Sequence, residues 1–190
     1  MRVSKEQTAR NRDRVVETGA RLFREHGLDG IGIADLMRAS GLTHGGFYGQ
    51  FESKEALAAE CIARSFVSSV ARWQRIVENA PDAPIRALAE DYLSLRHLNA
   101  IEHGCAFTAL APDAARRGGP IAVEMAAGMQ ALADILRQAL PDGNRAKALA
   151  LLSQMSGAMT LARSVNDPAL AQEILEAARA SVIAQGEGSA

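Results

Sequence analysis

Residues 43–54 hold most of the side chains whose types and spacing point to chemistry. Gly45 and Gly46 interrupt a stretch with aromatic residues at helical spacing, although each glycine costs a helix roughly 1 kcal/mol relative to alanine. Without a Cβ, the first turn of a helix can approach sugar and phosphate closely. The free N–H groups of that turn favour phosphate as a ligand. The stretch therefore predicts contact with a phosphate backbone.

Two side chains in the same stretch are suited to bind phosphate oxygens. Phe47 and Phe51 are four residues apart, which places both on one helix face and turns Tyr48 away from the core. The Tyr48 hydroxyl can donate to a phosphate oxygen, and Lys54 can add a charge-assisted contact. Residues 1–24 carry seven basic and three acidic side chains, a pattern equally compatible with a solvated helix face.

A second group of reactive residue types, His97, His103 and Cys105, surrounds a Gly-Cys-Ala turn. A thiolate beside a protonated histidine reacts with electrophiles or oxidants, whereas a small packing residue is the alternative interpretation of Cys105. Neither these residues nor Ser153 and Ser156 form a nucleophile–base unit, so we expect no enzyme. The two cysteines lack metal-ligand spacing, and we expect neither a metal nor a cofactor.

The bulk composition is that of a globular protein with a substantial core. The chain has 190 residues, 48% of them hydrophobic, and a formal net charge of −1. No long apolar run free of charges predicts a membrane span, and the first residues have no secretory signal pattern. With two cysteines far apart in sequence, we expect a cytoplasmic protein without disulfides and without a membrane partner.

Nearly every segment has the apolar periodicity of a helix, and we expect an all-α fold. Caps, glycines and prolines place helices at about 4–26, 33–39, 44–50, 53–80, 85–99, from 119 onward, 144–165 and 168–185. Thr43 and Ser53 are the expected N-caps of two of them. Residues 104–110 form a segment of small residues that leads to Pro112.

The helices at 33–39 and 44–50, joined by a tight turn at Gly41, form a helix-turn-helix pattern, whose second helix enters the major groove of DNA. Residues 5–57 resemble the N-terminal domain of the TetR family of bacterial transcriptional regulators, through "ARLFREHGLDG", "IADLMRASGLTHGGFYGQF" and "SKEAL". The resemblance implies an all-α homodimer whose C-terminal domain binds a small ligand. It also implies DNA contacts from Thr43, His44, Gly45, Tyr48 and Lys54.

Three glycines depart from the family pattern. Gly32 replaces the usual hydroxyl cap of the second helix, Gly46 replaces a small hydroxyl residue that often contacts DNA, and Gly49 replaces a large polar residue. His44 and Gln50 are then the best candidates for reading bases, since glutamine can pair bidentately with adenine. The predicted DNA-binding residues are Thr43, His44, Gly45, Gly46, Tyr48, Gln50 and Lys54.

We expect residues 1–52 to form the helix-turn-helix domain and residues 53–190, entered by a long fourth helix, to form the effector-binding and dimerisation domain. Methionine and aromatic residues can line an apolar effector cavity, although such residues are more often plain core. The predicted effector-binding residues are Phe66, Trp73, Tyr92, His97, His103, Cys105, Phe107, Met125 and Met129.

The last two helices look like the dimerisation pair of the family. The first is apolar on more than one side and so needs burial on two sides, by its own core and by a partner. One wholly buried central helix is the alternative. The predicted interface residues are Leu151, Met155, Ala158, Ala162, Ile174 and Ala178.

The function expected from these features is that of a ligand-responsive DNA-binding transcriptional regulator. We expect a repressor that binds a palindromic double-stranded operator as a homodimer and is released by a small apolar or electrophilic effector. The alternative is a TetR-like, DNA-bound interaction protein that no small ligand regulates.

Overall fold

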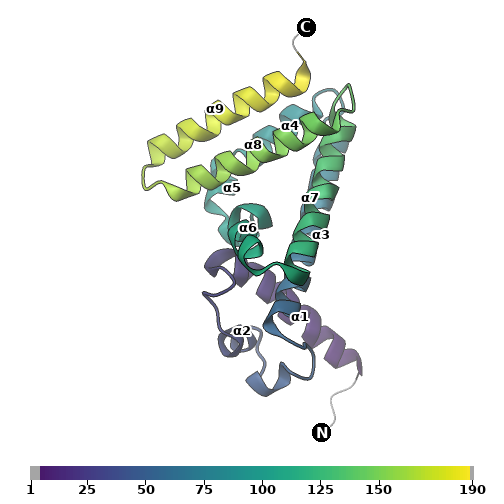
Figure 1. Ribbon diagram of the computed structural model, residues 1–190, viewed down its shortest axis with the longest axis vertical. Coiled ribbons are helices and arrows are strands. Elements are labelled where there is room, and N and C mark those ends of the chain that lie inside the picture. Colours follow the sequence, from purple (N-terminus) through teal and green to yellow (C-terminus); the bar gives the residue numbers. More distant parts are fainter. Residues whose placement is uncertain (1–4, 189–190) are drawn as a thin grey trace.

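A computed structural model of the chain describes residues 5–188, and every regular element in this range is helical (Figure 1). The expected all-α fold is therefore confirmed. The expected first helical residue, Ser4, lies outside the described residues. The elements are α1 (Lys5–His26), α2 (Ile33–Ala39), η1 (His44–Gly46), α3 (Lys54–Asn79), α4 (Pro84–Tyr92), α5 (Leu95–Asn99), η2 (Ile101–His103), α6 (Ala106–Arg117), α7 (Gly119–Ala139), α8 (Arg145–Ser164) and α9 (Pro168–Glu187).

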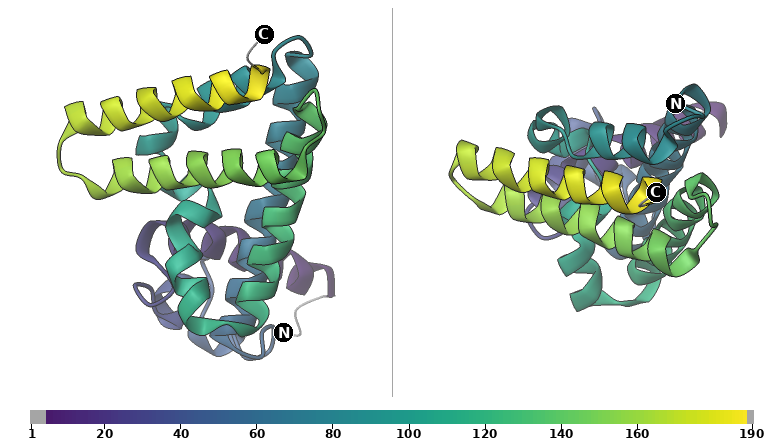
Figure 2. Two further views of the ribbon diagram at one scale, coloured as in Figure 1. Left: turned by 45° about the horizontal axis from the view of Figure 1, so that its top comes forward. Right: turned by 90° about the horizontal axis from the view of Figure 1, so that it is seen from above.

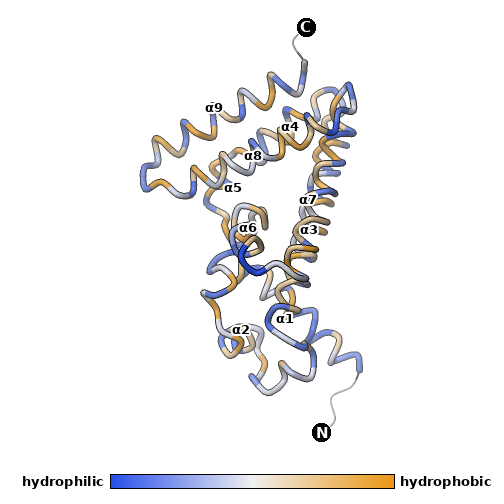
Figure 3. The backbone as a smooth tube through the Cα atoms, in the orientation of Figure 1, coloured by the Kyte–Doolittle hydropathy of each residue, from blue (hydrophilic) through white to orange (hydrophobic). Residues whose placement is uncertain are grey.

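The long helix α3 joins the two ends of the molecule. Figure 1 shows α1, α2 and the η1 turn at one end, the α8–α9 pair at the other, and α3 running beside α7 between them. The two views of Figure 2 show α8 and α9 as a hairpin whose helices lie side by side. Apolar residues recur along all the long helices (Figure 3), and one buried cluster extends from Phe23 and Leu57 to Leu151 and Val182.

Several helix boundaries follow from the predicted capping chemistry. Ser53 accepts a hydrogen bond from the N–H of Ala56 at 3.0 Å and starts α3, and Asn144 starts α8 in the same way with Lys147. Asp167 accepts from the N–H groups of Ala169 and Leu170 at the start of α9. Such caps satisfy N–H groups that have no partner within the helix.

The helix expected at 44–50 is wrong. Residues 44–46 form a single 3-10 turn, 47–50 continue as turns, and the Thr43 side chain makes no capping hydrogen bond. Three glycines in six residues, at positions 45, 46 and 49, explain the loss of α-helix, because each lowers helix propensity.

Two further segments differ from expectation. The helix expected at 85–99 breaks after Tyr92, where Ser94 caps α5 by accepting from the N–H of His97 at 3.2 Å. The segment expected to end at Pro112 is part of α6, which continues through the proline to Arg117. A proline inside a helix removes one donor, and the contacts of α6 with α1, α7 and α8 hold the helix together across it.

Within residues 5–188, no helix combines the length and the apolar character needed to cross a bilayer.

Candidate nucleic-acid interface and effector region

The turn that follows α2 is anchored by two stacked aromatic rings. Phe47 is fully buried, and its ring stacks on Phe51 with centroids 5.5 Å apart. The guanidinium of Arg12 in α1 lies 4.7 Å from the Phe51 ring centroid and forms an ion pair with Glu60 of α3 at 2.5 Å. The η1 turn is thereby held against both α1 and α3.

The side of this turn that faces solvent carries most of the predicted DNA-binding residues. Tyr48 is 67% exposed, and its ring stands edge-on to Phe47 at 5.2 Å and to His44 at 6.0 Å. Thr43, His44 and Gly45 are also exposed, while Lys54 is half-buried at the start of α3. Four predicted residues therefore share one exposed surface, and two rings fix the direction of the Tyr48 hydroxyl.

Neither glycine in the first turn is required by the packing of the chain. A Cβ added at Gly45 would meet no atom within 4 Å, and one at Gly46 would make an ordinary contact of 3.7 Å with Met37 Cε. Neither residue has a positive φ. Since alanine would fit and would stabilise the turn, the folded chain itself gives no reason for glycine here.

Gln50 is placed differently from the other predicted base-reading residue, His44. Its Nε2 donates to the Gly46 carbonyl at 3.1 Å, and its Oε1 is a buried oxygen without a hydrogen-bond partner among the described residues. A buried acceptor without a partner is costly. The amide must leave this position before it can read a base, whereas His44 is already exposed.

His97 occupies the centre of the predicted effector cluster as a neutral ring. Its Nε2 accepts from the backbone N–H of Cys105 at 3.1 Å, so Nδ1 carries the proton and donates to the Tyr92 carbonyl at 2.7 Å. Burial lowers the pKa of His97 to about 4. Of the two interpretations of Cys105, a thiolate paired with a protonated His97 is therefore excluded, because the ring is uncharged at neutral pH and contacts the backbone of Cys105.

The predicted effector residues do not line one cavity. Trp73, Tyr92, His97, His103 and Cys105 meet around a space of only about 20 Å³. Phe107 and Met129 border a groove of about 200 Å³ between α6, α7 and α8. Phe66 borders a third hollow of about 470 Å³ beside α7, and Met125 is a buried core residue.

Comparison with known proteins identifies the N-terminal part of the chain. The family model described as bacterial regulatory proteins, tetR family, matches residues 15–61. Over this segment the chain is similar to the TetR family. It is 30% identical over 84 residues to the HTH-type transcriptional repressor DhaR of Mycobacterium sp. (strain GP1), covering 44% of this chain and 42% of the relative. It is also 30% identical over 112 residues to the repressor KstR2 of Mycolicibacterium smegmatis, covering 58% and 53%. The chain thus matches about half the length of these relatives.

Solved structures extend the likeness in fold to nearly the whole chain. The reduced form of NemR from E. coli superposes with a TM-score of 0.77 at 22% identity, covering 91% of this chain and 95% of that one. A TetR-family regulator from Agrobacterium tumefaciens gives a TM-score of 0.78 at 20% identity, covering 93% and 100%. TetR-family relatives are transcriptional regulators, not enzymes.

The predicted interface residues of α8 lie inside the single chain. Leu151, Met155, Ala158 and Ala162 are all buried without a partner, whereas Ile174 and Ala178 of α9 are half-buried. The alternative of a wholly buried central helix is wrong, because α8 exposes Ser153, Gly157 and Leu161, the last by 59%. These three residues follow at intervals of four and so share one face of the helix.

Sequence reasoning missed two arginines that connect the elements around this region. Arg163 of α8 donates to the carbonyls of His97 and Leu98 and to the Thr108 hydroxyl. A Cβ at Gly104 would lie 2.7 Å from its Nη2, which explains the glycine. Arg24 of α1 donates to the Glu102 carbonyl and the Ser65 hydroxyl. In the sequence each is only a basic residue in the last turn of a helix, where the helix dipole favours one.

Proposed function

We propose that the chain is a DNA-binding transcriptional repressor that contacts the phosphate backbone through the η1 turn. The observation that carries this proposal is at Gly45. The fold leaves open space for a side chain there, yet the position holds a glycine, which lowers the stability of the turn. A binding partner whose surface comes close to the backbone of the η1 turn would explain this glycine. The family match on residues 15–61 supports double-stranded DNA as that surface.

Each residue of this surface has a proposed part in DNA recognition. Tyr48 and Lys54 bind phosphate oxygens, Thr43 and the N–H groups of Gly45 and Gly46 add contacts to the same strand, and His44 reads a base edge. Gln50 joins after its amide leaves the Gly46 carbonyl, which also removes a buried oxygen without a partner.

The repressor binds a palindromic operator as a homodimer formed by α8 and α9. Ser153, Gly157 and Leu161 form one exposed row on α8, and Leu170, Ile174 and Ala178 form a row with the same spacing on α9. Leu161 is 59% exposed and Leu170 42%. A second helix can approach closely along an exposed row that contains a small residue. We therefore place the interface on these two rows and no longer on the buried α8 residues.

A small apolar or electrophilic effector releases the operator by binding beside α6. The groove between α6, α7 and α8 offers Phe107 and Met129 as apolar walls and about 200 Å³ of space. Ser153 and Gly157 of the proposed dimer row also line this groove, so a bound effector would touch the proposed interface. It adjoins the Trp73–Tyr92–Cys105 cluster, which must open to admit a larger molecule or to expose the buried thiol. The effector must prefer one conformer of the dimer, because equal affinity for both would change nothing.

The DNA contacts are tested by binding measurements over a range of salt concentrations. Tyr48→Phe is expected to weaken binding to all sequences, and Lys54→Ala to lower the salt slope by about one unit as well. His44→Ala is expected to relax preference at particular base pairs while leaving the slope unchanged. Salt-dependent affinity that is the same in Tyr48→Phe, Lys54→Ala and the wild type would contradict this docking.

The effector is tested by release of bound DNA. Apolar candidates are expected to release wild type and Cys105→Ser equally, whereas a thiol-reactive quinone is expected to release only the wild type. Release of Cys105→Ser by the quinone contradicts a thiol mechanism. Intact DNA binding that no small molecule reverses favours a DNA-bound interaction protein.

A further inference from the structure

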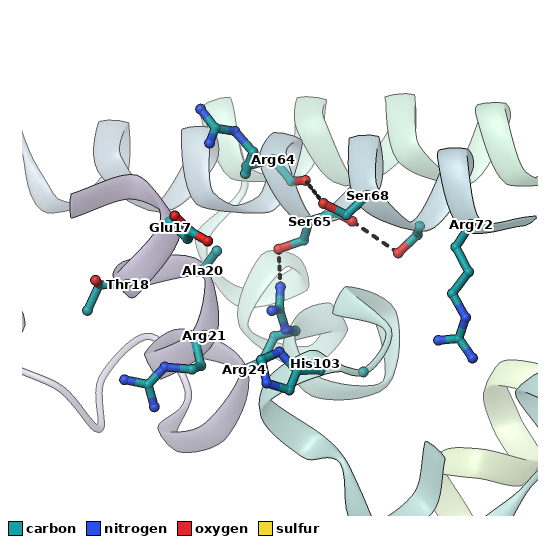
Figure 4. A pocket seen from close by; sticks show the side chains of 12 residues that line it. Glu17, Thr18, Ala20, Arg21, Arg24, Arg64, Ser65, Ser68, Arg72 and His103 are labelled. Atoms are coloured by element: carbon teal, nitrogen blue, oxygen red, sulfur yellow. Dashed lines mark hydrogen bonds between the residues drawn. The ribbon is translucent and has the colours of Figure 1, made fainter. Parts of the chain in front are cut away.

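A polar cavity of about 440 Å³ lies between α1, α3 and the end of η2, where His103 and Gly104 line it. Figure 4 shows Arg24 of α1 hydrogen-bonded to Ser65 of α3, with Arg21 also on α1 and Arg64 and Ser68 also on α3. His103 of η2 completes the lining on this part of the cavity. Among the described residues that line it are four arginines, with Arg72 the fourth, and one carboxylate, Glu17. None of the seven predicted DNA-binding residues borders this cavity.

Carboxylates pair with three of the four guanidinium groups but not with the fourth. Arg21 forms an ion pair with Glu102 at 3.0 Å, Arg64 with Asp13 at 3.0 Å, and Arg72 with Asp91. Arg24 is different, because within residues 5–188 its hydrogen-bond partners are the Glu102 carbonyl and the Ser65 hydroxyl, which are uncharged. Burial lowers the pKa of Arg24, so its charge is destabilised where it lies. The nearby Glu102 carboxylate offsets part of this effect but is paired with Arg21, and an anion in the cavity would add a counter-charge for Arg24 itself.

The hydrogen-bond donors and acceptors that the cavity residues leave unused indicate which class of ligand would fit. A guanidinium has five N–H donors, and Arg24 uses three of them, two on the Glu102 carbonyl and one on Ser65. Ser65, Ser68 and Ser69 donate to the carbonyls of Cys61, Arg64 and Ser65. The Ser65 oxygen already accepts from Arg24, so the oxygens of Ser68 and Ser69 are the ones that remain as acceptors for hydroxyl groups. The cavity thus combines donors for an oxyanion with acceptors for hydroxyls.

We propose that this cavity is a binding site for a small hydroxylated oxyanion, either a phosphorylated sugar or a hydroxycarboxylate. Arg24 binds the anionic group, with Arg64 and Arg72 at its sides, and the serine hydroxyls of α3 accept from the ligand's hydroxyl groups. The volume is within the range of ligand sites, roughly 300–1,000 Å³. Such a ligand is polar, unlike the proposed apolar or electrophilic effector, and its site is separate from the α6–α7–α8 groove.

The ligand class is tested by calorimetric titration of the full chain without DNA, at constant ionic strength. The probes are glucose 6-phosphate, citrate and, as the neutral control, glucose. We expect glucose 6-phosphate or citrate to bind with a dissociation constant below about 1 mM, and glucose not to bind. The probe that binds distinguishes a phosphate from a carboxylate ligand. Absence of binding by both anions overturns the proposal and leaves the proposed DNA function untouched.

Three variants test the location. Arg64→Gln removes a cavity arginine, and Arg75→Gln is its matched control, an exposed arginine of α3 outside the cavity. We expect Arg64→Gln to weaken binding roughly tenfold and Arg75→Gln to leave it unchanged. Arg24→Lys keeps the charge but removes the fork of donors and should abolish binding; should it also unfold the chain, the Arg64–Arg75 pair decides. Equal weakening by Arg64→Gln and Arg75→Gln shows attraction to net charge alone and overturns the site.

Discussion

Gly45 makes it possible to separate the stability of the chain from its affinity for DNA at a single residue. Gly45→Ala should leave the free energy of unfolding unchanged or raise it by up to about 1 kcal/mol, because the Cβ meets no atom within 4 Å. The same methyl group should weaken DNA binding about tenfold by holding the turn away from the sugar–phosphate backbone. Chemical denaturation and operator binding on the same preparation measure the two effects.

Gly41 is the matched control for this substitution. Its φ is +68°, so Gly41→Ala should destabilise the chain by about 1–2 kcal/mol, although the space around it is also empty. If Gly45→Ala binds the operator as tightly as the wild type, the main support for a close approach of DNA to the η1 turn is removed.

His97 should make the stability of the chain depend on pH in acid solution. Its pKa in the folded chain is lowered to about 4 by burial, whereas a histidine in an unfolded chain titrates near 6.5. Between these values the unfolded chain binds a proton that the folded chain does not. The free energy of unfolding therefore has its full value above pH 6.5 and falls by up to about 3 kcal/mol as the pH is lowered towards 4. Denaturation midpoints measured across this window should lose most of this slope in His97→Gln, but not in the exposed control His26→Gln.

At the scale of elements, close contact between α3 and α7 depends on Gly128. A Cβ there would overlap the ring of Phe66, which packs on Phe107 with centroids 5.0 Å apart. Gly128→Ala should therefore destabilise the chain by about 1–3 kcal/mol, despite the higher helix propensity of alanine. Adding Phe66→Leu should recover part of the loss, because the smaller side chain makes room for the methyl group. Additive losses in the double variant would show that the two residues do not interact.

The elements also show which features the sequence could predict. Local signals placed most helices correctly, since caps such as Ser53 and Asp167 act within one turn. Two features depended on contacts between distant segments. Pro112 lies within α6 because other helices pack around it, and Leu151 and Met155 are buried by the chain's own core. An apolar row shows that a face is buried, but it does not show whether the same chain or a partner covers it.

Of the two candidate sites, local sequence signals predict one and cannot predict the other. Tyr48 and His44 could be placed on an exposed surface because their neighbours Phe47 and Phe51 define the buried face locally. The cavity beside Arg24 could not be anticipated, since its walls come from α1, α3 and the end of η2, which are far apart in sequence.

At the scale of the whole molecule, the C-terminal half of α6 and the preceding η2 turn are tied to the DNA-reading end. Buried Asp113 of α6 accepts from the N–H of Leu28 at 3.2 Å, and Arg117 forms ion pairs with Asp29 and Glu55. Arg24 joins α1 to Glu102 in η2. A displacement of α6 by a ligand would therefore move the end of α1 and the start of α3 together, which is the coupling that the proposed release of DNA requires.

The arrangement of two reading heads on one operator depends on the proposed α8–α9 dimer. Leu161→Arg adds a charge to a side chain that is 59% exposed in the single chain, so it should not disturb the fold. In a dimer the charge would be buried without a partner, at a cost of several kcal/mol, and the protein should become monomeric. Val67→Arg, at a residue of α3 that is 66% exposed, is the matched control and should remain dimeric. Sedimentation equilibrium measures the association, and operator binding should weaken only in Leu161→Arg. A dimer that persists in Leu161→Arg would place the interface on another face of the molecule, and a monomeric wild type would contradict the proposal that two chains bind one palindrome.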